Sequence, residues 1–257
     1  MSKRNTKARR LEIVRLVNQL GEVSVDSLAN QFETSEVTIR KDLAALENTG
    51  LLLRRYGGAI ALPKEVVNED VASEVSIRKI SLAQTALKLI KDHNRILIDS
   101  GSTTGALIQM LNQKRGLVVM TNSLNIANAL RELENEPTIL MTGGTWDPHS
   151  ESFQGQVAES VLRSYDFDQL FIGCDGIDVA RGTTTFNELF GLSKVMSDVA
   201  REVIVMAESD KVGRKIPNLE LAWNVVDTLI TDDGLSSEDA ALIEARGVKV
   251  IIAKSEY

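Results

Sequence analysis

Apolar residues follow two different patterns along the chain. In residues 1–62 they recur at helical spacing in three short segments, after which comes a glycine-containing turn. From residue 81 onward, short apolar runs typical of buried strands alternate with segments of helical spacing. The segment 63–80 between them is polar and weakly periodic, with some helical character toward its end. The pattern therefore predicts a small domain over 1–62, a linker over 63–80 and a larger α/β domain over 81–257.

The small domain is predicted to contain three helices and a hairpin. The helices cover residues 6–20, 26–32 with Asp26 as N-cap, and 35–48 with Ser35 as N-cap. A short extended piece at 23–25 precedes the second helix. Two strands at 51–55 and 59–62 flank Tyr56-Gly57-Gly58, which predicts a hairpin with a glycine turn.

The larger domain is predicted to contain a mostly parallel sheet with helices on both faces, because apolar strands alternate with helices throughout it. The expected strands are 95–99, 117–121, 138–142, 170–172, 202–206, 228–231 and 248–253. The expected helices are 82–91, 105–111, 124–133, 156–163, 189–200 and 237–246.

Charge is distributed unevenly between the two parts. The chain of 257 residues carries a net charge of −7, yet residues 1–60 hold ten Lys and Arg against seven Asp and Glu. A basic head on an acidic body predicts that only the head meets a polyanion. Ordinary scatter of surface charge is the alternative at this point.

Composition narrows the class of protein further. A single cysteine, Cys174, and two histidines leave few ligands for a nitrogen–sulfur metal site, so we expect no metal and no other cofactor. One cysteine also favours a reducing cytoplasm. No apolar run approaches 18 residues, so we expect no membrane span.

The third predicted helix suits the major groove of DNA. Ile39, Leu43 and Leu46 define its buried face, which leaves small residues, a threonine and two adjacent bases exposed near its start. A solvated helix face is the alternative, but the helix closes a three-helix unit and a basic hairpin follows it. We expect DNA contacts from Ser35, Val37, Thr38, Arg40, Lys41, Arg54, Arg55 and Tyr56.

Polar turns follow three of the predicted parallel strands. Open α/β sheets bind ligands at the carboxyl ends of their strands, where loop amides and hydroxyls favour an anion. Taken alone, the Gly-Ser-Thr-Thr turn could equally be a helix cap, but several such turns meet at one edge. We therefore expect a small-molecule site that includes Asp99, Ser100, Gly101, Ser102, Thr103, Thr104, Thr121, Asn122, Gly143 and Gly144. Asp175 ends another strand between glycines, where its carboxylate could accept hydrogen bonds from sugar hydroxyls.

The motifs resemble those of the DeoR family of bacterial repressors over nearly the whole chain. The head carries three of them, at 24–29, 35–43 and 55–59, and the body carries four, at 99–104, 121–123, 143–144 and 173–178. The resemblance implies a winged helix-turn-helix joined to a sensor domain similar in fold to ribose-5-phosphate isomerase, with phosphorylated sugars as usual ligands. By the same resemblance, Asp175 and Glu188 would line the sugar end of the pocket, and Lys211 matches a lysine of one family loop. Glu208 and Asp210 depart from the family pattern of that loop, which more often has an aspartate at position 208 and a serine or threonine at position 210. An extra carboxylate near a phosphate would repel it.

The function that we expect is that of a DNA-binding repressor of a carbohydrate-utilisation operon. A phosphorylated sugar or polyol would release it from operator double-stranded DNA, and it would act as a homo-oligomer, a dimer or a tetramer. Its motifs look nearest to those of hexitol and amino-sugar regulators. The alternative is a sugar-phosphate isomerase-like enzyme carrying a DNA-binding head, with Glu188 as base and Asp175 as its partner. Arg181-Gly182 stands where that isomerase has a lysine, which argues against the enzyme.

Overall fold

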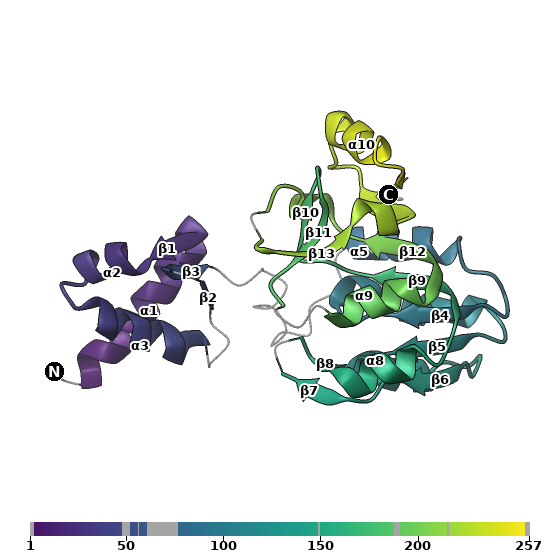
Figure 1. Ribbon diagram of the computed structural model, residues 1–257, viewed down its shortest axis with the longest axis horizontal. Coiled ribbons are helices and arrows are strands. Elements are labelled where there is room, and N and C mark those ends of the chain that lie inside the picture. The colour runs from purple at the N-terminus through teal and green to yellow at the C-terminus, as the bar shows by residue number, and fades with distance from the viewer. Residues whose placement is uncertain are drawn as a thin grey trace. The chain divides into compact units, whose positions relative to one another are not determined.

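The computed structural model describes residues 3–47, 52–55, 57–60, 77–148, 150–187, 191–214 and 216–254 (Figure 1). The described residues up to 60 form one compact unit, and those from 77 onward form a second. The expected linker, 63–80, lies outside the described residues except for its last four, which already belong to a helix of the second unit.

The first unit is a winged helix-turn-helix. It consists of α1 (Lys3–Leu20), β1 (Glu22–Ser24), α2 (Val25–Gln31), α3 (Glu36–Glu47), β2 (Leu53–Arg55) and β3 (Gly58–Ile60). The three strands form an antiparallel sheet in the order β1-β3-β2. Ile13 and Val17 of α1, Leu28 of α2, and Ile39 and Leu43 of α3 are almost completely buried together.

Two local predictions in this unit are wrong. Ser24, and not Asp26, is the N-cap of α2: its backbone is extended and its hydroxyl oxygen accepts a 3.1 Å hydrogen bond from the Ser27 amide. The helix therefore begins at Val25, two residues earlier than a cap at Asp26 implies, and the extended piece lies at Glu22–Ser24, where it pairs with β3. Both residue types cap helices well, so the sequence alone could not choose between them.

The second unit is built on a seven-stranded parallel sheet in the order β15-β14-β12-β9-β4-β5-β6. Its strands are β4 (Arg95–Ile98), β5 (Val118–Thr121), β6 (Thr138–Met141), β9 (Phe167–Ile172), β12 (Ala200–Met206), β14 (Thr228–Asp232) and β15 (Lys249–Ala253). Its helices are α5 (Ile77–Leu87), α6 (Ser102–Gly105), α7 (Leu124–Arg131), α8 (Gln156–Leu162), α9 (Gly191–Asp198) and α10 (Ser237–Glu244).

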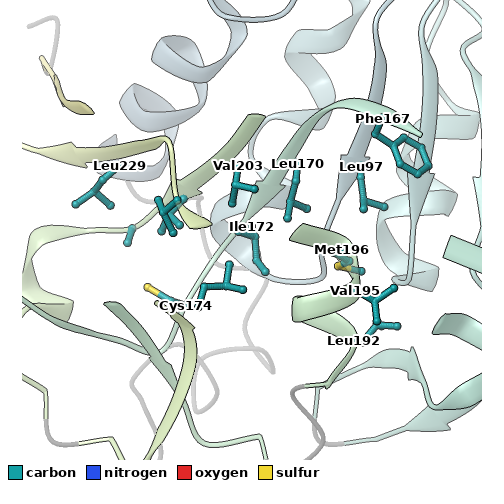
Figure 2. Packing of buried hydrophobic residues seen from close by; sticks show 14 of the residues in the cluster. Leu97, Phe167, Leu170, Ile172, Cys174, Leu192, Val195, Met196, Val203 and Leu229 are labelled. Carbon is teal, nitrogen blue, oxygen red and sulfur yellow. The ribbon is translucent and has the colours of Figure 1, made fainter. Parts of the chain in front are cut away.

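Helices bury both faces of this sheet, as the continuous apolar strands predict. Neighbouring residues of one strand point to opposite faces, so Ile98 lies in the cluster that includes α5 and α7, whereas Leu97 lies in the cluster that includes α8 and α9. Figure 2 shows Leu192 and Met196 of α9 packed beside the strand residues of this second cluster. The α/β class with a mostly parallel sheet is confirmed.

Several short elements were not predicted. A hairpin of β7 (Thr145–Asp147) and β8 (Ser152–Gln154) follows β6, and β10 (Gly176–Asp178), β11 (Gly182–Thr185) and β13 (Asn218–Ala222) form a small antiparallel sheet. The chain also contains the 3-10 helices η1 (Ile108–Gln113), η2 (Ser209–Lys211) and η3 (Trp223–Val225). The prediction of one helix over 105–111 is wrong, because α6 ends at Gly105 and the separate 3-10 helix η1 begins three residues later.

Candidate functional site

The exposed face of α3 contains most of the residues expected to contact DNA. The Ser35 hydroxyl oxygen accepts a 3.2 Å hydrogen bond from the Thr38 amide and lies 2.9 Å from the Thr38 hydroxyl oxygen, so Ser35 caps the helix as predicted. Val37 is 59% exposed, and Arg40 and Lys41 are also exposed. The spacing of the apolar residues therefore predicted the exposed face of this helix correctly.

Each arginine expected to contact DNA forms an ion pair within the first unit. Arg40 pairs with Glu36 one turn earlier, at 2.5 Å between nitrogen and oxygen. Arg54 of β2 pairs with Glu47 at 2.7 Å, and Arg55 pairs with Glu22 of β1. Tyr56, the remaining residue expected in the hairpin, lies outside the described residues.

Two further arginines of the head are held against α3 by a buried carboxylate. Asp42 is 2% exposed and forms ion pairs with Arg9 at 2.6 Å and with Arg10 at 2.8 Å, both from α1. The arginines of the head therefore fall into two groups. Arg9 and Arg10 fix α1 to α3, whereas the arginines of α3 and the hairpin lie at the surface. Sequence reasoning missed this use of Asp42, which only the tertiary contact between α1 and α3 shows.

The segment 99–104 follows β4 and is tied to the end of β5. The side-chain amide of Asn122 donates to the Asp99 carboxylate at 2.9 Å and accepts from the Ser100 amide at 3.0 Å. Asn122 is 1% exposed, so this double contact is sheltered from water. The structure thus brings together residues that the sequence pattern placed at one edge of the sheet.

Within this loop the side chains play unequal parts. The buried hydroxyl of Thr104 donates to the carbonyl oxygens of Asp99 at 2.8 Å and of Gly101 at 3.0 Å, so Thr104 holds the shape of the loop. Gly101 has φ +134°, a backbone angle that residues with a Cβ rarely adopt. Thr103 is buried, whereas Ser102 is exposed.

A lysine expected to lie in the linker contacts this loop. Lys79, in the first turn of α5, donates to the Ser102 hydroxyl at 2.8 Å. The loop leads into α6, which has only four residues and so supplies little helix dipole. The ammonium group of Lys79 is therefore an important positive charge at the loop.

The turns after β5 and β6 lie on adjacent strands of the same sheet. The Thr121 hydroxyl oxygen accepts a 3.0 Å hydrogen bond from the Ser123 amide and is buried. Gly143 and Gly144 have φ +59° and +116°, and a Cβ at Gly144 would lie 2.5 Å from the carbonyl oxygen of Gln154. Only glycine fits at position 144, because β8 packs so closely there.

Asp175, beyond the end of β9, is held by the small sheet. Its carboxylate accepts 2.9 Å hydrogen bonds from the Thr185 hydroxyl and from the Phe186 amide. Glu188, which the resemblance places nearby, lies outside the described residues.

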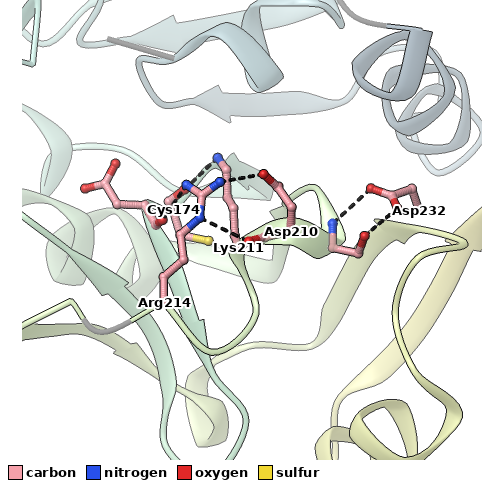
Figure 3. A network of polar contacts seen from close by, with 7 residues as sticks. Cys174, Asp210, Lys211, Arg214 and Asp232 are labelled. Atoms are coloured by element: carbon pink, nitrogen blue, oxygen red, sulfur yellow. Dashed lines mark hydrogen bonds and ion pairs between the residues drawn. The ribbon is translucent and has the colours of Figure 1, made fainter. Parts of the chain in front are cut away.

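Lys211 is 2% exposed and donates to the carbonyl oxygen of Cys174 at 2.8 Å (Figure 3). Cys174 is the residue that precedes Asp175 in the chain. In the same loop, the Asp210 carboxylate pairs with Arg214 at 2.6 Å, and Arg214 also donates to the Asp175 carbonyl oxygen at 3.3 Å. The unusual carboxylate at position 210 is therefore balanced by a neighbouring guanidinium group.

Two carboxyl groups near Asp175, those of the buried Glu220 and the partly buried Asp99, have strongly shifted pKa values. Burial raises the pKa of Glu220 to about 8, and the charges of Asp99 and Asp175 add to the rise, against a 2.8 Å hydrogen bond from Ser193. Burial also raises the pKa of Asp99 to about 6, against the hydrogen bonds from Asn122 and Ser100. Glu220 is therefore largely protonated at neutral pH, which lets its carboxyl group donate as well as accept. Sequence reasoning missed Glu220, because nothing in β13 marks it.

The described part of the chain contains no group of three or more His, Cys, Asp and Glu side chains arranged to hold a metal ion. None of its helices combines the length and the hydropathy that a membrane crossing requires.

Comparisons with known proteins match both units. Residues 9–65 match the family model described as the DeoR-like helix-turn-helix domain, and residues 75–233 match that of the DeoR C terminal sensor domain. The chain is 36% identical over 253 residues to the "Putative aga operon transcriptional repressor" of Escherichia coli O157:H7, covering 96% of this chain and 94% of that protein. It is 31% identical to the HTH-type transcriptional regulator GlpR of Haloferax volcanii, covering 95% and 96%.

Solved structures resemble the chain more distantly. Ribose 5-phosphate isomerase A from Methanocaldococcus jannaschii is 20% identical with a TM-score of 0.38, over 58% of this chain and 56% of that chain. The translation initiation factor eIF-2B of Pyrococcus horikoshii OT3 is 16% identical with a TM-score of 0.44, over 87% and 81%.

Proposed function

Because the chain belongs to the DeoR family of transcriptional regulators, we propose that it represses a carbohydrate-utilisation operon and leaves its operator when a phosphorylated sugar or polyol binds. It is a regulator and not an enzyme, in keeping with its relatives. In this proposal residues 1–62 bind DNA, and the second unit, which from α5 onward includes Lys79, senses the effector.

The effector proposal depends on the Lys79 ammonium group and the Asp99 and Asp175 carboxylates, which belong to loops beyond the carboxyl ends of adjacent strands. Lys79 contacts the loop 99–104, which offers amides and the Ser102 hydroxyl to a phosphate. Asp99 and Asp175, with the Asn122 amide between the strands, offer acceptors for sugar hydroxyls. A ligand with a phosphate at one end and hydroxyls along its length fits this set of groups, whereas a purely anionic ligand would be repelled by the carboxylates.

Lys79 also supports a route from the effector to the head. It lies in the first turn of α5 (Ile77–Leu87), which is the first described element after β3 of the head. A phosphate on the loop would compete with Ser102 for the Lys79 ammonium group and so alter the start of α5. The effector must bind the DNA-free state more tightly than the DNA-bound state, since otherwise it shifts no equilibrium.

Operator recognition by α3 fits a homo-oligomer. Winged heads of this kind place one helix in one major groove, so a dimer reads two half-sites about one helical turn apart. We propose a dimer, or a tetramer built from dimers, as the DNA-binding form.

Two linked experiments test this function. Selection from a random pool of duplexes identifies the operator, and we expect a sequence with two-fold symmetry. Thermal unfolding against a panel of sugar and polyol phosphates then identifies the effector, because a ligand at about 100 times its Kd adds about 2.7 kcal/mol of stability. Failure of every phosphorylated compound, with stabilisation by unphosphorylated sugars alone, would overturn the proposed effector class.

A further inference from the structure

A third carboxyl group lies near the two that the proposed function assigns to the effector. Glu220 of β13 is 7% exposed. Its carboxyl group accepts hydrogen bonds from the Ser193 hydroxyl of α9 at 2.8 Å and from the Thr183 hydroxyl of β11 at 3.5 Å. Two elements therefore hold this buried acid, and both do so through neutral hydroxyl groups.

A β-bulge in β13 gives Glu220 its position. The register of β13 against β11 shifts by one residue between Gly182 and Thr184. As a result, Glu220 and Leu221 both lie opposite Thr183, and both are buried. A bulge of this kind re-aims a side chain that would otherwise alternate across the sheet. The small sheet therefore departs from regular pairing at the residue that carries the buried acid.

The strand β11 also holds Asp175. Thr183 and Thr185 are two residues apart on this strand, so their side chains point to the same face of the small sheet. Thr183 donates to Glu220, and Thr185 donates to the Asp175 carboxylate at 2.9 Å. One face of β11 therefore brings the two carboxyl groups together.

Asp99 brings a third acid to this group from the loop after β4. Its backbone amide donates to the Phe171 carbonyl oxygen of β9 at 3.0 Å, and Asp175 follows the end of β9. The three acids affect one another: burial is the main reason that the pKa of Glu220 rises to about 8, and the charges of Asp99 and Asp175 add to the rise. We call Asp99, Asp175 and Glu220 the carboxyl cluster.

The charged groups of the described elements around β13 are exposed or donate to the backbone. In α9, Lys194 and Asp198 are exposed, and β11 has no ionisable side chain. Lys211 and Arg214 donate to the backbone carbonyl oxygens just before and at Asp175. Above neutral pH, the proton of Glu220 therefore decides whether the carboxyl cluster carries two negative charges or three.

We propose that Glu220 is a positioning residue of the effector site, which limits the negative charge of the carboxyl cluster while it holds a proton, and that effector affinity falls when this proton is lost. The inference rests on the proposed function, because it concerns the site formed by the loop 99–104 and Asp175.

The physical reason is the charge that the effector itself carries. A phosphate monoester is close to a dianion above pH ~7, so a third carboxylate in the cluster repels it. Ionised Glu220 also favours the protonated forms of Asp99 and Asp175, which then accept fewer hydrogen bonds from the effector hydroxyls. The effector therefore binds more tightly to the form in which Glu220 is neutral, and its affinity decreases as pH rises through the pKa of Glu220.

Isothermal titration of the full chain with hexose and hexitol 6-phosphates, at pH 7 and at pH 9, measures this dependence. The lower pH avoids protonation of the phosphate group itself, which occurs near pH ~6. Since the pKa of Glu220 is about 8, we expect wild-type affinity to fall about fivefold to tenfold over this range. Titrations at pH 8 in two buffers of different ionisation enthalpy should show uptake of about half a proton for each molecule bound.

Two variants of this region separate a role in binding from a role in folding. Glu220→Gln is neutral at every pH, so its affinities at pH 7 and pH 9 should agree within about twofold. Ser193→Ala removes a hydrogen bond that lowers the pKa of Glu220, so its affinity should fall at a higher pH than that of the wild type. Glu244→Gln, an exposed change on α10, is the matched control and should follow the wild type. A purely structural role would change the affinity by the same factor at both pH values.

An equal fall in Glu220→Gln and wild type, or a wild-type affinity that is the same at pH 7 and pH 9, overturns the proposal and leaves the proposed function intact. If Glu220→Gln does not fold, a fall in Ser193→Ala at the wild-type pH overturns it. Binding of none of these phosphates at pH 7 would instead overturn the proposed function, and this inference with it.

Discussion

Lys79 is the cation whose removal should affect effector binding most selectively. Its ammonium group donates to Ser102 in the loop proposed to bind phosphate. A hydrogen bond to a charged group contributes about 1.5–3 kcal/mol, so Lys79→Ala should weaken effector binding about 10- to 100-fold. Isothermal titration of the variant with the identified effector measures this loss.

Lys88→Ala is the matched control for this prediction, because Lys88 is exposed just beyond the end of α5. It should bind the effector like wild type. Equal affinities for the wild type and Lys79→Ala would place the phosphate away from the loop 99–104.

Glu220 should make the stability of the protein fall as pH rises toward 8. Its pKa is raised to about 8 by burial, whereas a glutamate of the unfolded chain titrates near pH ~4.3. Between these values the folded chain keeps a proton that the unfolded chain has lost, so its contribution is complete below pH ~4.3 and disappears as pH rises through about 8. Glu220→Gln removes this dependence.

The measurement is chemical denaturation of both proteins from pH 5 to 8.5. The stability of Glu220→Gln relative to wild type should increase with pH, by up to about 1.4 kcal/mol per pH unit. Glu244→Gln, an exposed change on α10, should run parallel to wild type. Parallel curves for Glu220→Gln would show that Glu220 is ionised in the fold.

Among the residues of the candidate site, the sequence could predict those that belong to short motifs at the ends of strands. The loop 99–104 and Asn122 follow strands whose ends meet, so topology alone brings them together. Lys79 and Glu220 could not be found this way. Their partners lie 23 and 27 residues away in the chain, at Ser102 and Ser193, and neither residue belongs to a recognisable pattern.

A side chain should be tolerated less well at Gly101, in the loop between β4 and α6, than at Gly105, the last residue of α6. Gly101 has φ +134°, so Gly101→Val strains the backbone where the ligand is proposed to bind. A Cβ at Gly105 would meet open space, and φ there is not positive, so Gly105→Ala should be accommodated. Gly101→Val should lose the thermal shift caused by the effector, and Gly105→Ala should keep it. Retention of the shift in both variants would contradict the assignment of this loop.

The helix α3 should depend on Asp42 for its position against α1. Asp42→Asn leaves Arg9 and Arg10 without their carboxylate, and Arg9 is only 11% exposed in its side chain. Breaking a buried ion pair costs about 3 kcal/mol, so amide hydrogen exchange in α3 should accelerate accordingly. Asp26→Asn, an exposed change on α2, should leave the exchange unchanged. Protection of α3 at the wild-type level in Asp42→Asn would show that these pairs contribute little.

The larger elements were predictable because their apolar periodicity is strong, and their bounds differ from the predicted ones by a few residues. The small antiparallel sheet was not, because β11 consists of one glycine and three threonines and β13 joins it from more than 30 residues further along. The hairpin β7–β8 was missed for a related reason. Its strands have three residues each, too few for an alternating pattern to be detected.

For the molecule as a whole, effector binding and DNA binding are linked equilibria. Whatever affinity for operator the effector removes, the operator must remove from effector binding by the same factor. Loss of one function with retention of the other is therefore informative, since an unfolded variant would lose both. Gly101→Val, at a distance of more than 40 residues along the chain from the described end of the first unit, is suited to this separation.

Titration of the operator complex with the identified effector tests the central claim most directly. Fluorescence anisotropy of a labelled operator duplex reports release of the protein as the effector concentration rises. Wild type should leave the duplex, and Gly101→Val should bind it with wild-type affinity and stay bound at every effector concentration. A wild-type complex that persists at saturating effector, or a Gly101→Val complex that dissociates at wild-type concentrations, would contradict the account.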